Sequence, residues 1–391
     1  MKKFLLFVAL AFSTNAWSID DDVKNVIPNT SEFGSEETLE TGILNDLIQK
    51  SVAEKQVTTA KPSYGFNISD YASTPKVGAY IIGAYKYSDQ KGANGGPGFN
   101  ARLIRAYVNG NILKDFNYYL QVEINGEPHI IDFYLEWAKY KEFSVKIGEF
   151  KRAFTFENPM NPFDVGVGDY SQAVKKLAGM GDRCGEATTG GRDQGLQVQG
   201  DLFPLSKGGY RLVHYQLGIY NGNGINKADN NAKKDIIGTL QVQPIKDLFI
   251  GFFGWKGNWS NGTVTVDRNR YAFGVKYEHN NWSARSEFVH SSGHKVSEYN
   301  ATTGEWSGTG KADDFYATVG IPIAPWFKVY LKYDQYRDQA TANTAHTIYT
   351  ITPNFRLHKN LNFQIQYNYH NDKTSADQKY SDLWFMTYVR F

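Results

Sequence analysis

The sequence predicts an all-β protein: a transmembrane, antiparallel, up-and-down β-barrel of about sixteen strands. Three observations lead to this prediction. Apolar and polar residues alternate in short segments from Lys76 onward, the connections between these segments alternate between long and short, and residues 383–391 form an aromatic strand that ends on Phe391. A closed barrel must pair its last strand with its first, because only closure removes both edges of the sheet.

The first eighteen residues have the pattern of a secretory signal peptide. Lys2 and Lys3 precede an apolar run over residues 4–12, and Ala16-Trp17-Ser18 provides a small-residue cleavage site. The apolar run is shorter than the ~20 residues that a membrane-spanning helix needs. We therefore expect residues 1–18 to be removed.

Residues 19–75 are expected to form a periplasmic leader with a short helix. Within residues 36–56 the apolar side chains recur at helical spacing, and the segment begins with Glu36 and Glu37, which suits the helix dipole. There are too few heptads to establish a coiled coil. A short coiled coil or docking helix and a lone amphipathic or partly disordered leader both remain open.

Residues 76–391 are predicted to be the barrel. In residues 115–124, Phe116, Tyr118 and Leu120 share one face while Asn117 and Gln121 lie on the other, as in a half-buried strand. Many such segments are close to the ~10 residues of a tilted membrane strand. The predicted strands are 76–88, 99–109, 115–124, 130–138, 143–151, 194–202, 210–220, 235–243, 247–256, 269–278, 282–290, 313–321, 326–334, 346–355, 360–369 and 382–391.

The connections support an up-and-down topology. Odd-numbered strands are followed by polar loops, and most even-numbered ones by tight turns, as in barrels with long external loops and short periplasmic turns. The predicted loops are 89–98, 125–129, 152–193, 221–234, 257–268, 291–312, 335–345 and 370–381, of which 125–129 alone is short.

Composition excludes several classes of protein. The mean hydropathy is −0.48, which argues against a helical membrane protein. A single cysteine, Cys184, excludes a disulfide scaffold and is expected to be a non-catalytic thiol. Of 42 basic residues, Lys2 and Lys3 fall in the signal peptide, so 40 remain against 40 acidic residues. This balance predicts no nucleic-acid partner, and the 15% of aromatic residues suits the aromatic girdles of a membrane barrel.

Three segments resemble the phosphate-selective porin O and P family. Residues 143–159 contain G-E-F-K-R-A-F-T-F-E, residues 190–200 read G-G-R-D-Q-G-L-Q-V-Q-G, and residues 220–226 read Y-N-G-N-G-I-N. The resemblance covers residues 76–391. It implies a homotrimeric, sixteen-stranded channel in the outer membrane of a Gram-negative bacterium, in contact with lipid and lipopolysaccharide. It further implies that the third external loop folds inward to narrow the pore and that small hydrophilic or anionic solutes, phosphate among them, diffuse through it.

The long loop at 152–193 and the inward faces of the strands provide the candidate functional residues. A loop of this length inside a compact domain is usually functional. The candidates for lining or constricting the pore are Arg105, Lys146, Asp164, Lys175, Lys176, Arg183, Arg192, Lys276, Arg285, Lys328 and Lys332. Alternation also places acidic residues on the inward face, namely Glu123, Asp132, Glu136, Glu278, Glu287 and Asp334. Because opposite charges interspersed in a wide pore largely cancel, we expect at most a mild anion preference.

Two other classes of function remain open. A barrel-borne outer-membrane hydrolase would need a positioned nucleophile and base, but the sequence has no G-x-S-x-G elbow and no evident Ser/His pair. An adhesin or receptor would use the external loops. We favour a passive channel without enzymatic activity, cofactor or metal site.

Overall fold

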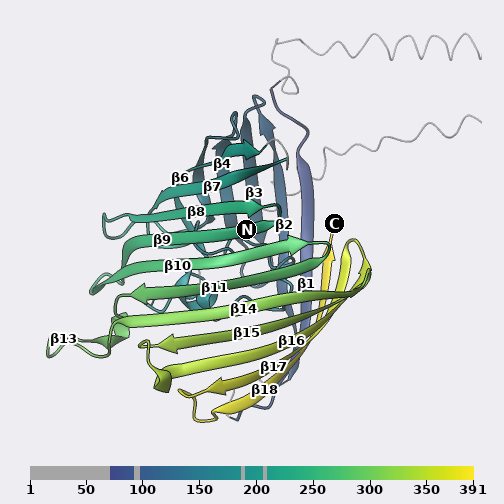
Figure 1. Ribbon diagram of the computed structural model, residues 1–391. Coiled ribbons are helices and arrows are strands. Elements are labelled where there is room, and N and C mark those ends of the chain that lie inside the picture. The colour runs from purple at the N-terminus through teal and green to yellow at the C-terminus, as the bar shows by residue number, and fades with distance from the viewer. Residues whose placement is uncertain (1–70, 92–96, 186–189, 206–208) are drawn as a thin grey trace, which may run out of the picture. The chain divides into compact units, whose positions relative to one another are not determined.

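The computed structural model describes residues 71–91, 97–185, 190–205 and 209–391 (Figure 1). The predicted signal peptide and the predicted leader helix lie outside these residues. The described part forms a closed barrel of sixteen antiparallel strands, which confirms the predicted fold class. Within the described ranges, no helix is long and apolar enough to cross a membrane.

The strands follow one another around the barrel in chain order. Their bounds are β1 Lys76–Ser88, β2 Gly98–Ile112, β3 Phe116–Glu123, β4 His129–Trp137, β5 Ser144–Lys151, β6 Arg192–Leu205, β7 Tyr210–Tyr220, β8 Asp235–Ile245, β9 Leu248–Ser260, β10 Thr265–His279, β11 Trp282–Ser292, β14 Lys311–Ala324, β15 Phe327–Asp338, β16 Ala345–His358, β17 Leu361–Asp372 and β18 Lys379–Arg390. Besides the barrel strands, the described residues contain a small hairpin and three short helical segments, namely β12 Tyr299–Asn300, β13 Glu305–Trp306, α3 Gln172–Leu177, η2 Val296–Glu298 and η3 Ala342–Thr344.

The last strand closes the barrel against the first, as the sequence predicts. β1 and β18 pair from Tyr80 with Arg390 to Ser88 with Asp382. The backbone pairing continues through Phe391, whose carbonyl accepts a hydrogen bond from the Ala79 amide at 2.8 Å and whose amide donates back at 3.0 Å. The terminal aromatic residue is thus held by the first strand.

Long and short connections lie at opposite ends of the barrel. At the end where β1 begins, here called the turn end, β8–β9, β10–β11, β14–β15 and β16–β17 are joined by two-residue turns. Asn280 and Asn281 both have positive φ, 49° and 66°, as a two-residue hairpin turn requires. The opposite end, here called the loop end, carries the longer connections. The predicted loop at 257–268 is wrong in extent, because β9 and β10 continue pairing and leave only residues 261–264 between them.

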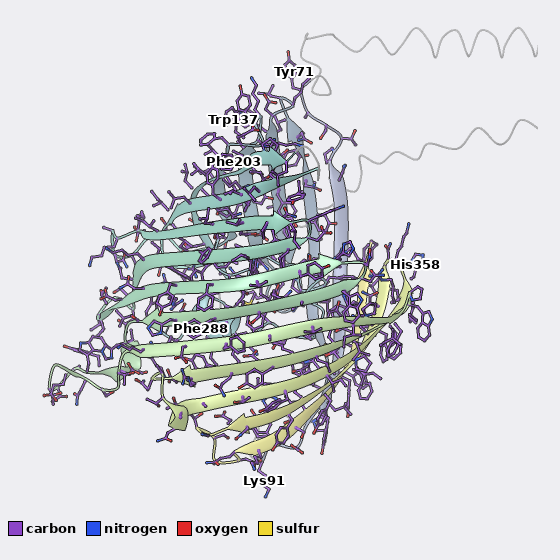
Figure 2. All side chains as sticks on the ribbon, in the orientation of Figure 1. Tyr71, Lys91, Trp137, Phe203, Phe288 and His358 are labelled. Atoms are coloured by element: carbon purple, nitrogen blue, oxygen red, sulfur yellow. The ribbon has the colours of Figure 1, made fainter. Side chains whose placement is uncertain are left out.

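The two faces of the wall differ in polarity, as alternation predicts. On β10, Tyr271 and Phe273 point outward and are each 53% exposed, while Ala272 between them is buried. Large apolar side chains recur in this way over the outer surface (Figure 2). The buried polar residues, including Arg105, Gln121 and Gln366, lie on the inner face.

The interior of the barrel is filled on one side. The main apolar core joins side chains of the connection between β5 and β6, such as Phe154, Val174 and Leu177, to inner-face residues of β7–β15, such as Trp255 and Tyr316. The opposite wall, β1–β6, faces a cavity. The cavity on the unfilled side is the candidate functional site.

Candidate functional site

Residues 152–185 and 190–191, here called the inner loop, lie between β5 and β6 in the chain and enter the barrel. Carboxylates and amides of distant strands accept hydrogen bonds from backbone amides of the inner loop. Glu287 on β11 accepts from Phe156 at 2.6 Å, and Gln366 on β17 accepts from Gly168 at 2.5 Å. Asp334 on β15 accepts from the first residue of α3, Gln172, at 2.9 Å. These partners face the interior, so the prediction that this loop folds inward is confirmed.

The inner loop reaches the turn end of the barrel. Phe163 packs edge-on against Tyr388, with 5.6 Å between the ring centroids. The guanidinium of Arg390 lies 4.0 Å from the Phe163 ring centroid and 3.1 Å from the Asp164 carboxylate. Arg390 is the last residue of β18 and lies at the turn end. The inner loop therefore extends along most of the length of the barrel.

A cluster of three buried arginine–aspartate pairs lies where the inner loop meets the wall near the loop end, and one of them, Arg270–Asp182, fastens the returning part of the loop. The pairs are Arg152–Asp193 at 2.8 Å, Arg268–Asp235 at 2.6 Å and Arg270–Asp182 at 2.5 Å. All three guanidinium groups lie about 5 Å from the ring of Trp255, at 5.0, 4.8 and 4.8 Å. Arg270 also donates to the Leu177 carbonyl at 2.6 Å. Buried ion pairs hold a structure well only when their hydrogen bonds are satisfied, and Arg270 makes several.

One of the spaces that the inner loop leaves open is a cavity of about 240 Å³, here called the slot. One side is formed by uncharged loop residues, namely Ala153, Pro159, Asn161 and Pro162. The other side is the wall, with Tyr80, Arg105, Tyr119, Gln121, Asp132, Tyr134, Lys146, Phe150, Lys151, Arg192, Gln197 and Gln216. The lining therefore carries four basic side chains and one acidic side chain.

The four cations are held differently. Arg105 pairs with Glu123 at 2.6 Å, and Arg192 pairs with Asp132 at 2.7 Å. The Lys151 ammonium donates to the backbone carbonyls of Asn158 and Met160, at 2.8 and 2.6 Å.

Lys146 differs from these three cations. Its ammonium lies 4.6 Å from the Tyr134 ring centroid and 5.4 Å from that of Phe150. Within the described residues neither Lys146 nor Lys151 has a carboxylate within ion-pair distance, but Lys151 donates three hydrogen bonds and Lys146 donates none.

Two further predicted residues, Lys175 and Lys332, line a second cavity of about 240 Å³ towards the loop end. Lys175 on α3 pairs with Asp169 at 2.7 Å, and Lys332 pairs with Asp334 at 3.0 Å. Burial disfavours ionisation of Asp169, but Lys175 and Arg102 outweigh it and hold the pKa of this carboxyl below its usual range. The same pairing raises the pKa of Lys175.

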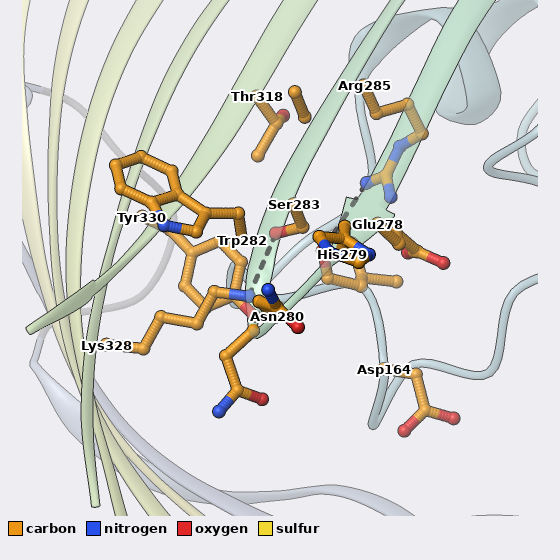
Figure 3. Close-up of a pocket in the computed structure, with 13 residues that line it drawn as sticks. Asp164, Glu278, His279, Asn280, Trp282, Ser283, Arg285, Thr318, Lys328 and Tyr330 are labelled. Atoms are coloured by element: carbon orange, nitrogen blue, oxygen red, sulfur yellow. Dashed lines mark hydrogen bonds between the residues drawn. The ribbon is translucent and has the colours of Figure 1, made fainter. Parts of the chain in front are cut away.

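Three predicted residues line a cavity of about 290 Å³ at the turn end (Figure 3). Asp164 points into it from the inner loop, Arg285 pairs with Glu157 at 2.8 Å, and Lys328 donates to Ser283 at 3.0 Å. Lys276 also faces inward and lies 4.8 Å from the Phe249 ring centroid.

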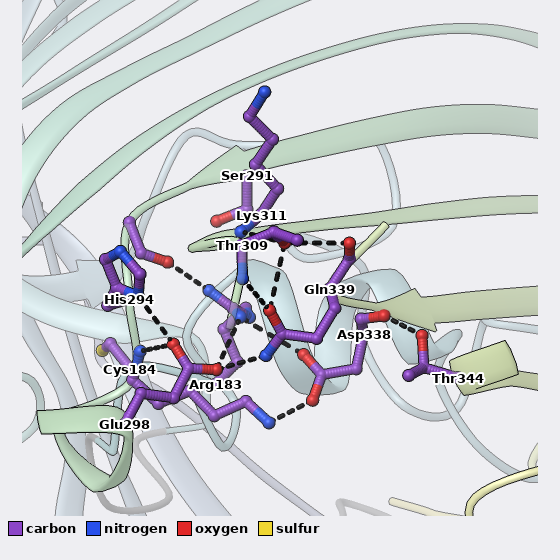
Figure 4. Close-up of polar contacts among 12 residues, drawn as sticks. Arg183, Cys184, Ser291, His294, Glu298, Thr309, Lys311, Asp338, Gln339 and Thr344 are labelled. Atoms are coloured by element: carbon purple, nitrogen blue, oxygen red, sulfur yellow. Dashed lines mark hydrogen bonds and ion pairs between the residues drawn. The ribbon is translucent and has the colours of Figure 1, made fainter. Parts of the chain in front are cut away.

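Arg183 and Lys176 lie away from the slot. Arg183 donates to the Gly293 carbonyl and, at 3.2 Å, to Asp338, so it ties the inner loop to the connection that follows β11 (Figure 4). Lys176 lies over the ring of Tyr336, 4.9 Å from its centroid. Of the predicted residues, the structure therefore brings only Arg105, Lys146 and Arg192 together in the slot.

Sequence reasoning missed Lys151, although it stands inside the segment 143–159 that carries the family resemblance. Strand alternation places Lys151 on the face opposite to Phe150, which points inward. Lys151 is the last residue of β5, where the regular alternation ends and the inner loop wraps around its ammonium. Proximity to the start of the long loop was the signal that could have identified it.

The closed barrel with an inner loop has the fold of the bacterial outer-membrane porins. The anion-selective porin of Comamonas acidovorans matches with a TM-score of 0.63 and 13% identity, over 81% of this chain and 99% of that one. The outer-membrane channel DcaP of Acinetobacter baumannii matches at 0.58 and 11% identity, over 83% and 99%. OmpT of Vibrio cholerae, an outer-membrane protein described in a trimer form, matches at 0.54 and 12% identity, over 81% and 99%.

At these identities the likeness establishes the fold. No family profile matches the chain, and no curated protein matches it. The resemblance to the phosphate-selective porins therefore stays a prediction.

Proposed function

We propose that this protein is a porin of the Gram-negative outer membrane, a passive channel for small hydrophilic solutes that favours anions. The observation that carries the proposal is the slot, where four basic side chains and one acidic one line the space beside the inner loop. Selectivity of an aqueous pore depends on the charge at its narrowest part. A cavity of about 480 Å³ at the turn end has the same balance, with Lys328, Arg356, Lys359 and Arg390 against Asp164. Both spaces therefore favour anions.

The porin-like fold and the slot favour a channel over the two alternatives. A hydrolase needs a nucleophile within hydrogen-bond reach of a base, whereas the slot offers cations, amides and phenols. An adhesin would have no use for cations directed into an internal cavity. A phosphate preference, implied by the family resemblance, would be carried by the same four cations.

We further propose a homotrimer, embedded in lipid and lipopolysaccharide, that forms after removal of residues 1–18. Strands β3, β4 and β5 have only 8, 9 and 8 residues, whereas the shortest of the other barrel strands has 11. Short strands make this part of the wall shorter than the hydrocarbon core of the membrane. Such a wall is better suited to contact with other subunits than to contact with lipid. The trimer form of the Vibrio cholerae protein supports the same assembly.

The test is the reversal potential of the purified protein in planar lipid bilayers under a tenfold KCl gradient. We expect stepwise conductance and a reversal potential displaced towards that of chloride. The absence of conductance steps from correctly folded protein would refute the channel, and displacement towards potassium would refute the anion preference. Block of the chloride current by low concentrations of phosphate would establish the narrower specificity.

A further inference from the structure

A row of aromatic side chains crosses the slot wall on neighbouring strands. The rings of Tyr107 and Tyr119 stack at 5.8 Å between centroids, and those of Tyr119 and Tyr134 at 5.5 Å, with interplanar angles of 20° and 19°. Phe150 continues the row at 6.1 Å from Tyr134. Tyr119 therefore has a ring against each face, and Tyr134 has Tyr119 against one face and the Lys146 ammonium nearby. The row presents ring edges and hydroxyls to the slot rather than open ring faces.

Several polar atoms on this wall have no protein partner among the described residues. The Gln121 amide nitrogen Nε2 and the Arg192 Nε are buried without a hydrogen bond. Both residues are only 3% exposed. No protein group bonds the hydroxyl of Tyr119 or of Tyr134 within the described ranges. The Gln121 and Arg192 nitrogens have almost no accessible surface, so a solute does not reach them. The two tyrosines line the slot, and a solute that bonds their hydroxyls is favoured there.

We infer that the slot binds polyhydroxylated carboxylates, the class to which sugar acids belong; this rests on the proposed channel function. A carboxylate pairs with Lys146, which has neither a carboxylate partner nor a hydrogen bond among the described residues, through charge-assisted hydrogen bonds. Solute hydroxyls both donate and accept, as needed by the Tyr119 and Tyr134 hydroxyls.

The geometry disfavours two other classes of anion. A flat aromatic carboxylate gains affinity by stacking on ring faces, but the faces of Tyr119 are already covered. A small carboxylate such as acetate can pair with one cation but cannot reach donors on β3, β4 and β5 at once. Neutral sugars lack the charge that the slot attracts.

The experiment measures block of the chloride current through single channels by glucuronate, glucose, acetate and benzoate. We expect glucuronate to interrupt the current at concentrations at least roughly tenfold below those of the other three, since it alone combines charge with several hydrogen bonds. Equal block by acetate and glucuronate would overturn the inference, because charge alone would then suffice. Stronger block by benzoate would overturn it in favour of stacking.

A double variant, Tyr119→Phe with Tyr134→Phe, removes two hydroxyls and keeps both rings. We expect the ratio of glucuronate block to acetate block to fall roughly tenfold. Tyr271→Phe is the matched control, because Tyr271 lies on the outer face of β10, and it should leave that ratio unchanged. An unchanged ratio in the double variant would contradict the role of the hydroxyls. Failure of the channel proposal itself would instead appear as absent conductance or cation selectivity in the wild-type protein.

Discussion

Replacing Lys146 with glutamate should sharply reduce anion selectivity while leaving the barrel folded. Lys146 lines the slot, has no carboxylate within ion-pair distance in the described residues and packs only against rings. The substitution changes the charge of the slot lining from +3, four basic less one acidic, to +1.

The size of the effect follows from Coulomb's law. At ~5 Å in water, one unit charge contributes about 0.8 kcal/mol to the energy of a permeating ion. Screening near physiological salt reduces this to about 0.4 kcal/mol. A change of two charge units disfavours an anion and favours a cation by about 0.9 kcal/mol each. The ratio of anion to cation permeability should therefore fall roughly 20-fold, and Lys146→Gln should give roughly a fourfold fall.

The assay is the reversal potential under a tenfold KCl gradient, where complete selectivity corresponds to about 59 mV for a monovalent ion. Lys176→Glu is the matched control, because it makes the same charge change on α3, away from the slot. Heat-modifiable migration on gels would show that each variant is folded. A Lys146→Glu shift no larger than that of Lys176→Glu would refute the assignment of selectivity to the slot.

Three further predictions concern the inner loop and the pairing of β1 with β18 that closes the barrel. Arg270→Ala leaves the buried Asp182 carboxylate without its main partner, which costs about 3–5 kcal/mol. We expect noisy, larger conductance steps, and steady wild-type steps would contradict the role of this pair in holding the inner loop. Deleting Phe391 removes two hydrogen bonds to the Ala79 backbone, each worth about 0.5–1.5 kcal/mol, and should lower the temperature at which the barrel unfolds on gels; an unchanged temperature would contradict this. The pKa of Asp169 is lowered, so its carboxylate stays ionised and paired with Lys175 even at the ordinary aspartate pKa of ~3.9. The pair is lost only when the pH falls below that value. Conductance should thus change in strong acid, where this pair is lost, and Asp169→Asn should abolish that acid step; an acid step that survives the substitution would assign it to another group.

Much of the fold could be predicted from the sequence because a barrel strand is a local pattern. Alternation alone placed Arg105, Lys146 and Lys328 on the inner face, where the structure has them. The position of the slot could not be predicted in this way. It depends on which wall the inner loop packs against, and that is decided by contacts such as Gly168 to Gln366, which are 198 residues apart. The pairing of each cation likewise depends on neighbouring strands rather than on its own segment.

The one-sided filling of the barrel separates the residues that hold the protein together from those that meet the solute. Side chains of β7–β15 pack with the inner loop as in a soluble core, so substitutions there cost folding free energy. Most slot-facing side chains of β2–β5 lie outside that core, and several border the cavity. Substitutions on that wall can change which solutes pass at little cost in stability. The solute specificity of this barrel can therefore change through substitutions on β2–β5, while selection for folding stability keeps the residues of β7–β15.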